Sequence, residues 1–153
     1  MNLQEEVVIP LDRATVYAAL NDSEILQQSI PGCESLTKVS DTDMEAVVVV
    51  KFGPVKASFN SEVTLNTEGE PEQFSLTGKG DAGIAGFAKG GADVTLTEQD
   101  SAESGKETVL NYEVQIDISG KLAQVGSRLI EGTCKRLAKK FFQNFEQAVV
   151  PPA

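Results

Sequence analysis

The feature of this sequence that most constrains its fold is a long region of alternating apolar and polar residues. The alternation runs through residues 33–119 and is interrupted by short turns rich in glycine, proline or charged residues. A period of two is typical of strands with one buried and one solvated face. Because short turns join successive strands, the region predicts an antiparallel meander with one apolar face.

The apolar positions of this region define the face that we expect to be buried. In chain order they include Ala46, Val48, Val50, Phe52, Val55, Ala57, Phe59, Val63, Leu65, Phe74, Leu76, Ala92, Val94, Leu96, Leu110, Tyr112, Val114, Ile116 and Ile118. The carboxylates of Glu62, Asp93, Glu113 and Asp117 fall on the other face. Solvated charge is the default at such positions.

Helical signals flank the alternating region on both sides. Residues 1–9 predict a strand, after which Asp12 is a suitable N-cap for a short helix over residues 13–20. A second short helix has its N-cap among residues 21–23 and is ended by the Pro31-Gly32 pair. The chain therefore opens with a strand and two short helices.

The end of the chain predicts one long helix over residues 120–149, which contain no proline. Its apolar stripe consists of Leu122, Val125, Leu129, Ile130, Thr133, Leu137, Phe141 and Phe145. At 1.5 Å per residue such a helix is about 40 Å long, enough to cross a small domain. Gly126 interrupts the stripe, and glycine costs stability inside a helix. Either a close approach by backbone or ligand, or ordinary packing on the sheet, would explain it.

These segments predict a single α+β domain over residues 1–150. A curved antiparallel sheet of about seven strands, two short helices and the long C-terminal helix would form two layers. A strongly curved sheet grips the helix at one end and stands away from it at the other, which leaves an internal apolar cavity. This is the helix-grip arrangement of the START and plant-allergen-like superfamily.

The composition argues against several classes of function. The net charge of −10 over 153 residues disfavours nucleic acid as a partner, because affinity for phosphate comes from clustered Lys and Arg. The chain has no histidine, and its two cysteines, Cys33 and Cys134, lie far apart. We therefore expect no metal site, no cofactor and no histidine-dependent catalysis. Neither a signal-peptide pattern nor an apolar run of about 20 residues is found, which predicts a cytoplasmic protein.

A glycine motif at residues 78–83, GKGDAG, resembles the dinucleotide-binding fingerprint. That fingerprint needs a helix to open at its third glycine. Three further glycines, Gly86, Gly90 and Gly91, disfavour a helix at this point. We interpret the motif as a hairpin or a bulged strand end.

The predicted long helix also carries four of the 13 basic residues, Lys135, Arg136, Lys139 and Lys140, opposite its apolar stripe. This pattern is typical of an interfacial helix, and equally of a core helix with a solvated back. We favour the core helix, because the apolar face of the sheet needs a cover. An additional role in orienting the acidic body toward a membrane or an acidic partner stays open.

Five segments of the chain resemble one known family. They are PGCESL at 31–36, VKFGPVKA at 50–57, GIAGFAKG at 83–90, ADVTL at 92–96 and GKLAQVGSRLI at 120–130. In this order they resemble the family of the carbon monoxide dehydrogenase G subunit over nearly the whole chain. The resemblance implies a helix-grip fold with a deep hydrophobic cavity. It also implies an accessory protein of molybdenum-containing carbon monoxide dehydrogenases and related hydroxylases, linked to quinone binding and to membrane attachment of the enzyme.

The candidate ligand-binding residues come from the apolar strand faces, the helices and this resemblance. They are Ile30, Phe52, Phe59, Phe87, Tyr112, Ile116, Leu122, Gly126 and Ile130. The resemblance suggests the cavity-lining role of Phe87, Leu122 and Ile130. Tyr112 is the candidate polar group, because a buried phenol needs a partner and its hydroxyl suits a ligand carbonyl. The alternative is that these residues fill a solid core.

The expected function is non-enzymatic binding of a quinone, isoprenoid or lipid, as an accessory factor or carrier for a molybdenum hydroxylase. One alternative is a cyclase or hydratase of the same fold, which requires an inward-facing carboxylate of raised pKa. Another is a protein-interaction module for enzyme maturation or membrane recruitment. Members of the family that dock at membranes extend beyond the domain, whereas this sequence stops at Ala153. We therefore expect at most peripheral association with the inner membrane surface.

Overall fold

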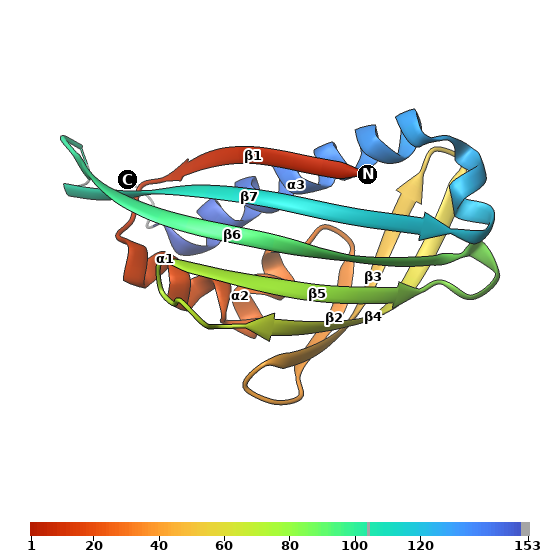
Figure 1. The fold of residues 1–153 in the computed structure, drawn as a ribbon, viewed down its shortest axis with the longest axis horizontal. Helices are drawn as coiled ribbons and strands as arrows, with labels where there is room; N and C mark the ends of the chain where they lie inside the picture. The colour runs from red at the N-terminus through yellow and green to blue at the C-terminus, as the bar shows by residue number, and fades with distance from the viewer. Residues whose placement is uncertain (104, 151–153) are drawn as a thin grey trace.

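In the computed structural model, which describes residues 1–103 and 105–150, a curved sheet and a long helix form two layers (Figure 1). Within the described residues the sheet has seven strands in the order β1-β7-β6-β5-β4-β3-β2, and every neighbouring pair is antiparallel. The strands are β1 (Asn2–Ile9), β2 (Cys33–Lys38), β3 (Asp43–Phe52), β4 (Val55–Asn66), β5 (Gln73–Asp81), β6 (Phe87–Ser101) and β7 (Gly105–Ser119). The predicted α+β fold with a curved antiparallel sheet of about seven strands is confirmed.

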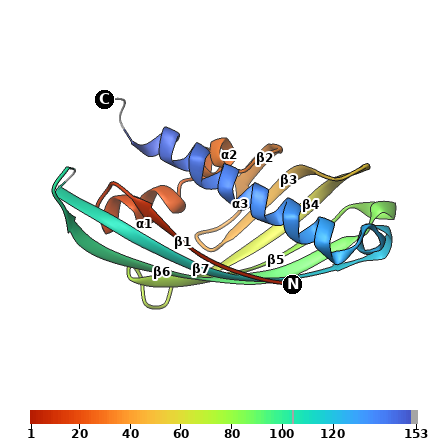
Figure 2. The same cartoon turned by 90° about the horizontal axis from the view of Figure 1, so that it is seen from above.

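Two short helices follow β1, α1 (Arg13–Leu20) and α2 (Ser23–Ser29). Their N-caps agree with the sequence: the Asp12 carboxylate accepts from the Thr15 amide at 3.2 Å, and the Asp22 carboxylate accepts from the Glu24 amide at 2.9 Å. A side-chain oxygen at the N-cap satisfies a backbone donor that the helix itself leaves unpaired. Figure 2 shows both helices at one end of the concave side of the sheet, with α3 (Ser127–Val149) lying across that side.

The long helix begins at Ser127, so the predicted start at residue 120 is wrong. Residues Gly120–Val125 form a separate 3-10 helix, η2, and Gly126 joins it to α3 with φ +101°. Only glycine adopts such a φ at little cost. Gly126 is therefore explained by this bend, since it lies outside the helix and nothing lies within 4 Å of a Cβ built there. The 23 residues of α3 span about 35 Å.

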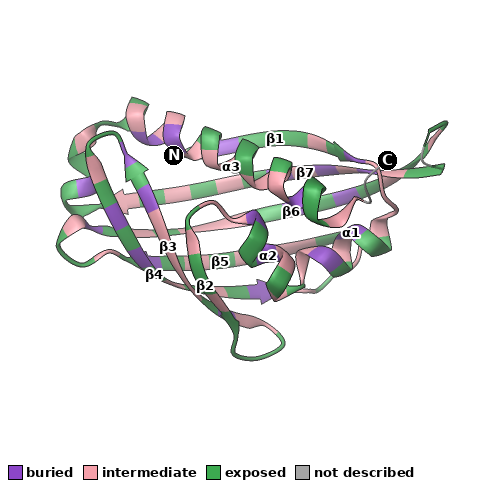
Figure 3. Cartoon of the chain, turned by 180° about the vertical axis from the view of Figure 1, so that it is seen from behind, coloured by how far each residue is buried: buried purple, intermediate pink, exposed green. Residues whose placement is uncertain are grey.

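The core lies in separate clusters along α3. Near the end of the helix, Phe145 packs with Ile9, Val16, Leu96 and Leu110. Near its start, Ile130 packs with Val50, Phe52, Phe59 and Leu122, and a third cluster joins Leu26, Met44 and Leu65. Figure 3 shows the buried residues distributed over the sheet, α1, α2 and α3. Between these clusters, the middle of the molecule is less tightly packed.

The glycine motif forms the end of β5 and the turn into β6, which contains a short 3-10 helix, η1 (Gly83–Ala85). Strands β5 and β6 are antiparallel neighbours, so the interpretation as a hairpin is confirmed. In the described part of the chain, no helix is both long and apolar enough to span a membrane.

Candidate functional site

A cavity of 420 Å³ lies between the concave face of the sheet and the helices. The helices and the C-cap of α2 contribute Leu20, Leu26, Ile30, Ala138, Phe141 and Phe142, and the strands contribute Leu36, Met44, Ala46, Val48, Ser61, Val63, Leu65, Phe74, Leu76, Ala92, Val94, Leu110, Tyr112 and Val114. Ser61 and Tyr112 are the polar side chains of this lining. We call this space the inner cavity. Its walls offer a ligand apolar surface and very few hydrogen bonds.

A second hollow of 320 Å³ continues along the same face toward the start of α3. It is lined by Phe52, Phe59, Ile116, Ile118 and Cys134, among others. The two spaces share lining residues, including Val48, Val63, Leu76 and Val114, so they adjoin. Together they form an elongated apolar site on the concave side of the sheet.

The space exists because small residues occupy neighbouring inward positions of the sheet. Ala46, Ser61, Gly80 and Ala88 pair in succession across four strands. In the next row of the sheet, Gly78 pairs with Gly90. Side chains of this size do not reach the helix layer, so the space between the sheet and α3 is left unfilled here. The sequence placed Ala46 on the buried face and drew attention to the glycines, but none of these residues was predicted to shape the site. Glycine, alanine and serine at inward positions were the signal.

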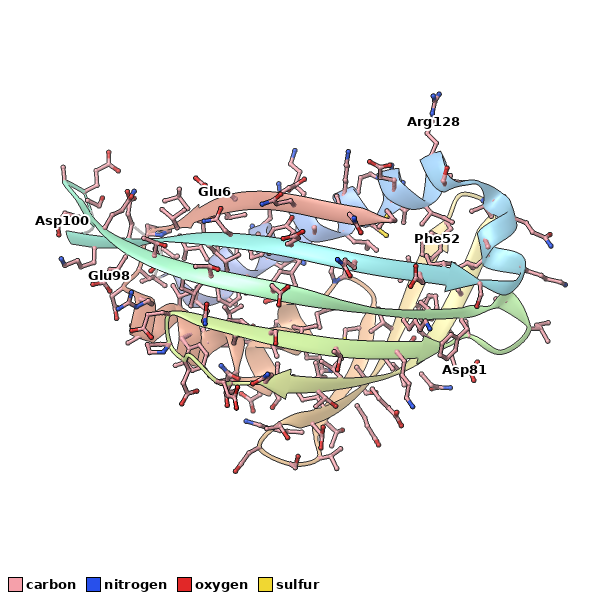
Figure 4. The ribbon with its side chains drawn as sticks, viewed as in Figure 1. Glu6, Phe52, Asp81, Glu98, Asp100 and Arg128 are labelled. Atoms are coloured by element: carbon pink, nitrogen blue, oxygen red, sulfur yellow. The ribbon has the colours of Figure 1, made fainter. Side chains whose placement is uncertain are left out.

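Five of the predicted site residues line these spaces. Ile30 and Tyr112 line the inner cavity, and Phe52, Phe59 and Ile116 line the adjoining hollow. Figure 4 places Phe52 at the end of the molecule where α3 begins. Four of these five residues lie on the inward faces of strands, and Ile30 follows α2.

The remaining four predicted residues lie elsewhere. Leu122 and Ile130 are buried in the packed cluster at the start of α3 and line neither space. Gly126 is exposed at the bend before α3. Phe87 is 36% exposed and borders two hollows of 570 and 650 Å³ on the outer face, which Glu62 and Lys79 also line. The placement of Phe87 in the cavity was wrong because the inward positions of β6 are the even-numbered ones, Ala88 to Leu96.

An aromatic cluster on α3 was missing from the predicted site. Phe142 stacks on Tyr112 with ring centroids 5.4 Å apart, and Phe141 meets Phe142 edge-on at 5.0 Å. Phe141 belongs to the predicted apolar stripe, whereas Phe142, the next residue in the chain, does not. These rings form the helix side of the inner cavity near the end of α3.

The Tyr112 hydroxyl donates a hydrogen bond to the Glu5 carboxylate on the neighbouring strand β1, with an O–O distance of 2.9 Å. Burial is the main cause that raises the pKa of Tyr112 well above its usual value, and the bond to Glu5 raises it further. The phenol therefore stays protonated and its proton is already shared. The sequence had suggested that this hydroxyl would donate to a ligand carbonyl. In the structure its proton is already used in the bond to Glu5.

Groups that could perform chemistry are sparse around the site. Within residues 1–103 and 105–150, no cluster of His, Cys, Asp and Glu could hold a metal ion. Both cysteines are free, and burial raises the pKa of the Cys33 and Cys134 thiols. No Asp or Glu of the described residues lines the inner cavity. The arrangement suits enclosure of apolar surface.

Solved structures share this fold along the full length of the chain. A conserved protein from Geobacillus kaustophilus has a TM-score of 0.86 at 23% identity, covering 97% of this chain and 95% of its own. A START superfamily protein from Mycobacterium smegmatis has a TM-score of 0.70 at 11% identity, covering 97% and 96%. The Zhui aromatase/cyclase from Streptomyces sp. R1128 has a TM-score of 0.64 at 9% identity, covering 97% and 93%. At these identities the likeness establishes the fold alone.

No curated protein matches the chain significantly. The model of one protein family, described as the G subunit of carbon monoxide dehydrogenase (CoxG), matches residues 6–150.

Proposed function

The chain belongs to the CoxG family, that of the carbon monoxide dehydrogenase G subunit, and on this premise we propose that it binds a hydrophobic small molecule in the inner cavity. The ligand class is a quinone, an isoprenoid or another lipid. Residues 1–150 form the ligand-binding domain in this proposal. The identity of the family and the properties of the cavity support it independently.

The observation that carries the proposal is the 420 Å³ apolar cavity, whose polar side chains are Ser61 and Tyr112. Burial of apolar surface contributes about 25 cal/mol per Å², so a long hydrocarbon chain gains affinity here with few polar contacts. Pockets for small molecules have volumes of about 300–1,000 Å³, and this cavity falls in that range. The adjoining hollow gives an elongated ligand further room.

We propose that the ligand is held without being converted. The fold is shared with an aromatase/cyclase, so an enzymatic role requires a test of its own. Such a role calls for an acid or base beside the substrate. Tyr112 is the ionisable side chain among the residues that line the inner cavity. Its raised pKa makes the phenol a weak acid and leaves almost no phenolate to act as a base, and its proton is already shared with Glu5.

Within its family context, we propose that the protein acts as an accessory factor or carrier for a molybdenum-containing carbon monoxide dehydrogenase or a related hydroxylase. The family match supports this role. A carrier of a quinone or lipid would work at the membrane surface by peripheral contact. Copurification of a dehydrogenase subunit with the chain tests the partnership.

The binding proposal is tested by native mass spectrometry of the protein purified from its own host, followed by lipid extraction. We expect an adduct whose extracted mass corresponds to a quinone, isoprenoid or other lipid. We also expect that adding the extracted compound raises the melting temperature, because a ligand that binds only the folded state stabilises it. No adduct, and no quinone or lipid that raises the melting temperature, would contradict the proposal.

A further inference from the structure

A groove of 430 Å³ runs between β1, an edge strand of the sheet, and residues 135–146 of α3. Val7 and Ile9 form its apolar side on β1. Lys135, Arg136 and Lys139, three of the four residues of the basic strip, line it from α3. The groove thus combines apolar surface with positive charge on a protein whose net charge is −10.

The groove and the inner cavity share one wall, the Phe142 side chain. Its ring stacks on Tyr112 at a centroid distance of 5.4 Å. The Tyr112 hydroxyl then reaches Glu5, which also lines the groove. A turn of the Phe142 ring away from Tyr112 would join the two spaces at this point.

The cations of the groove are only partly neutralised. Lys135 forms an ion pair with Glu131 at 3.1 Å, and Arg136 donates to the Thr133 hydroxyl at 3.2 Å. In the described part of the chain, neither Arg136 nor Lys139 has a carboxylate within ion-pair distance.

Two carboxylates, Glu5 and Glu146, line the groove against its three cations. The hydrogen bond that Glu5 accepts from the neutral Tyr112 hydroxyl does not cancel its charge, so the lining residues together carry one net positive charge. The remaining positive charge beside an apolar opening is suited to an anion attached to a hydrocarbon chain.

We propose that ligands enter the inner cavity between β1 and α3, past Phe142, and that an acidic amphiphile is the preferred class. Its hydrocarbon chain fills the cavity, while its carboxylate or phosphate group stays in the groove at Arg136 and Lys139. This inference rests on the proposed function and narrows its ligand class.

The charge requirement is tested with three probes that share one chain length: dodecanol, dodecanoate and dodecyl phosphate. Their affinities for the full chain are measured at low salt and about pH 8, where the carboxylate is ionised. Each exposed charge contact is worth a few-fold in affinity, so we expect both anions to bind about tenfold more tightly than dodecanol. If dodecanoate binds more tightly than dodecyl phosphate, the groove prefers a carboxylate; if the order is reversed, it prefers a phosphate.

A charge-matched pair of double variants locates the effect. Arg136→Gln with Lys139→Gln should reduce the affinity for both anions to that for dodecanol and leave dodecanol unaffected. Arg128→Gln with Lys140→Gln changes the net charge equally but lies outside the groove, and Figure 4 shows Arg128 pointing away from the body of the protein. The control should retain the anion preference. Equal binding of all three probes would overturn the inference while supporting the proposed function, and no binding of any probe would contradict both.

The position of the opening is tested by the kinetics of dodecanoate binding. Phe142→Ala should raise the association and dissociation rates severalfold, whereas Phe87→Ala, on the outer face, should change neither. If Phe142→Ala does not fold, Phe142→Leu provides the same comparison with less loss of volume. Rates that are unchanged in a folded Phe142 variant would overturn this route.

Discussion

Gly78 and Gly90 pair across β5 and β6, yet a side chain would meet very different surroundings at the two positions. A Cβ at Gly90 would lie 2.1 Å from the Gln115 carbonyl oxygen, which no real structure tolerates. A Cβ at Gly78 would lie 3.5 Å from its nearest neighbour, the Glu62 carbonyl oxygen, an ordinary contact. At Gly90, close backbone contact therefore leaves no room for a side chain. At Gly78 there is room for a small one.

This difference predicts unequal effects of the same substitution. Gly90→Ala should lower the free energy of unfolding by about 2 kcal/mol or more, because backbone has to move. Gly78→Ala should change it by at most about 1 kcal/mol, and the reduced freedom of the unfolded chain favours a small gain. Urea denaturation of both variants measures the two values. Equal effects of the two substitutions would contradict the different surroundings of Gly78 and Gly90.

The two tyrosines of the chain are both held in the protonated form. Burial, followed by a hydrogen bond to Glu70, raises the pKa of Tyr17 to about 12. For Tyr112 the causes are burial and Glu5, and its pKa is also raised. Because each folded-state pKa lies above that of the unfolded chain, the associated stability is complete below about pH 10 and is lost as the pH rises toward the folded-state values.

A titration of phenolate absorbance tests this behaviour. In the native protein, we expect less than half of the phenolate signal at about pH 11, whereas the chain in denaturant should pass its midpoint near pH 10. Tyr17→Phe should remove one of the two native steps. A native midpoint near pH 10, with circular dichroism still unchanged, would contradict the pKa shifts.

At the scale of elements, α3 is fixed near both of its ends. Ile130 packs at the start, and Phe145 is fully buried near the end, against Ile9 and Val16. Between them the helix faces the site with Ala138, Phe141 and Phe142. The helix therefore spans the cavity and is held by contacts on either side of it.

Truncation of Phe145 should be costly for this reason. Phe145→Ala should lower the free energy of unfolding by about 3–5 kcal/mol, the usual cost for a fully buried phenylalanine. Phe87→Ala removes the same atoms from the outer face of the sheet and should cost about 1 kcal/mol or less. Thermal or urea unfolding compares the two. A small effect of Phe145→Ala would mean that the end of α3 is not anchored as described.

The elements were predictable from sequence where the local signals are strong. Asp12 and a capping residue among positions 21–23 marked the two short helices, and period-two alternation marked the strands and their buried faces. The start of α3 was missed because residues 120–125 continue the helical spacing of apolar residues. Positive φ angles at Gly120 and Gly126 break the helix there, and a sequence pattern does not show φ.

The site itself was harder to predict than the fold. The period of two identified Tyr112 and Ile116 as inward-facing. Large apolar residues of this kind mark the buried face, whereas the existence of the cavity depends on small residues. Ala46, Ser61, Gly80 and Ala88 become significant only when the strand register brings them into one row. Register depends on pairings between distant parts of the chain, which the alternation alone does not specify.

For the molecule as a whole, the hollow lies between packed clusters that stabilise the two ends. A native core is normally close-packed, with few voids larger than a water molecule. A space of 420 Å³ lined by apolar side chains is therefore a costly feature unless something fills it. The proposed binding of a hydrophobic ligand would account for a fold that is well packed around this space.

The dissociation constant of a quinone with a decyl tail tests this central claim most directly when it is compared across three forms of the protein. Ala92→Leu places a larger side chain in the inner cavity, and Thr95→Leu adds a leucine to the exposed face of the same strand, β6. We expect the wild type and Thr95→Leu to bind equally. Ala92→Leu should bind at least about tenfold more weakly, because its side chain occupies ligand space. Equal dissociation constants for all three forms, or no binding to the wild type, would contradict the claim that this cavity holds the ligand.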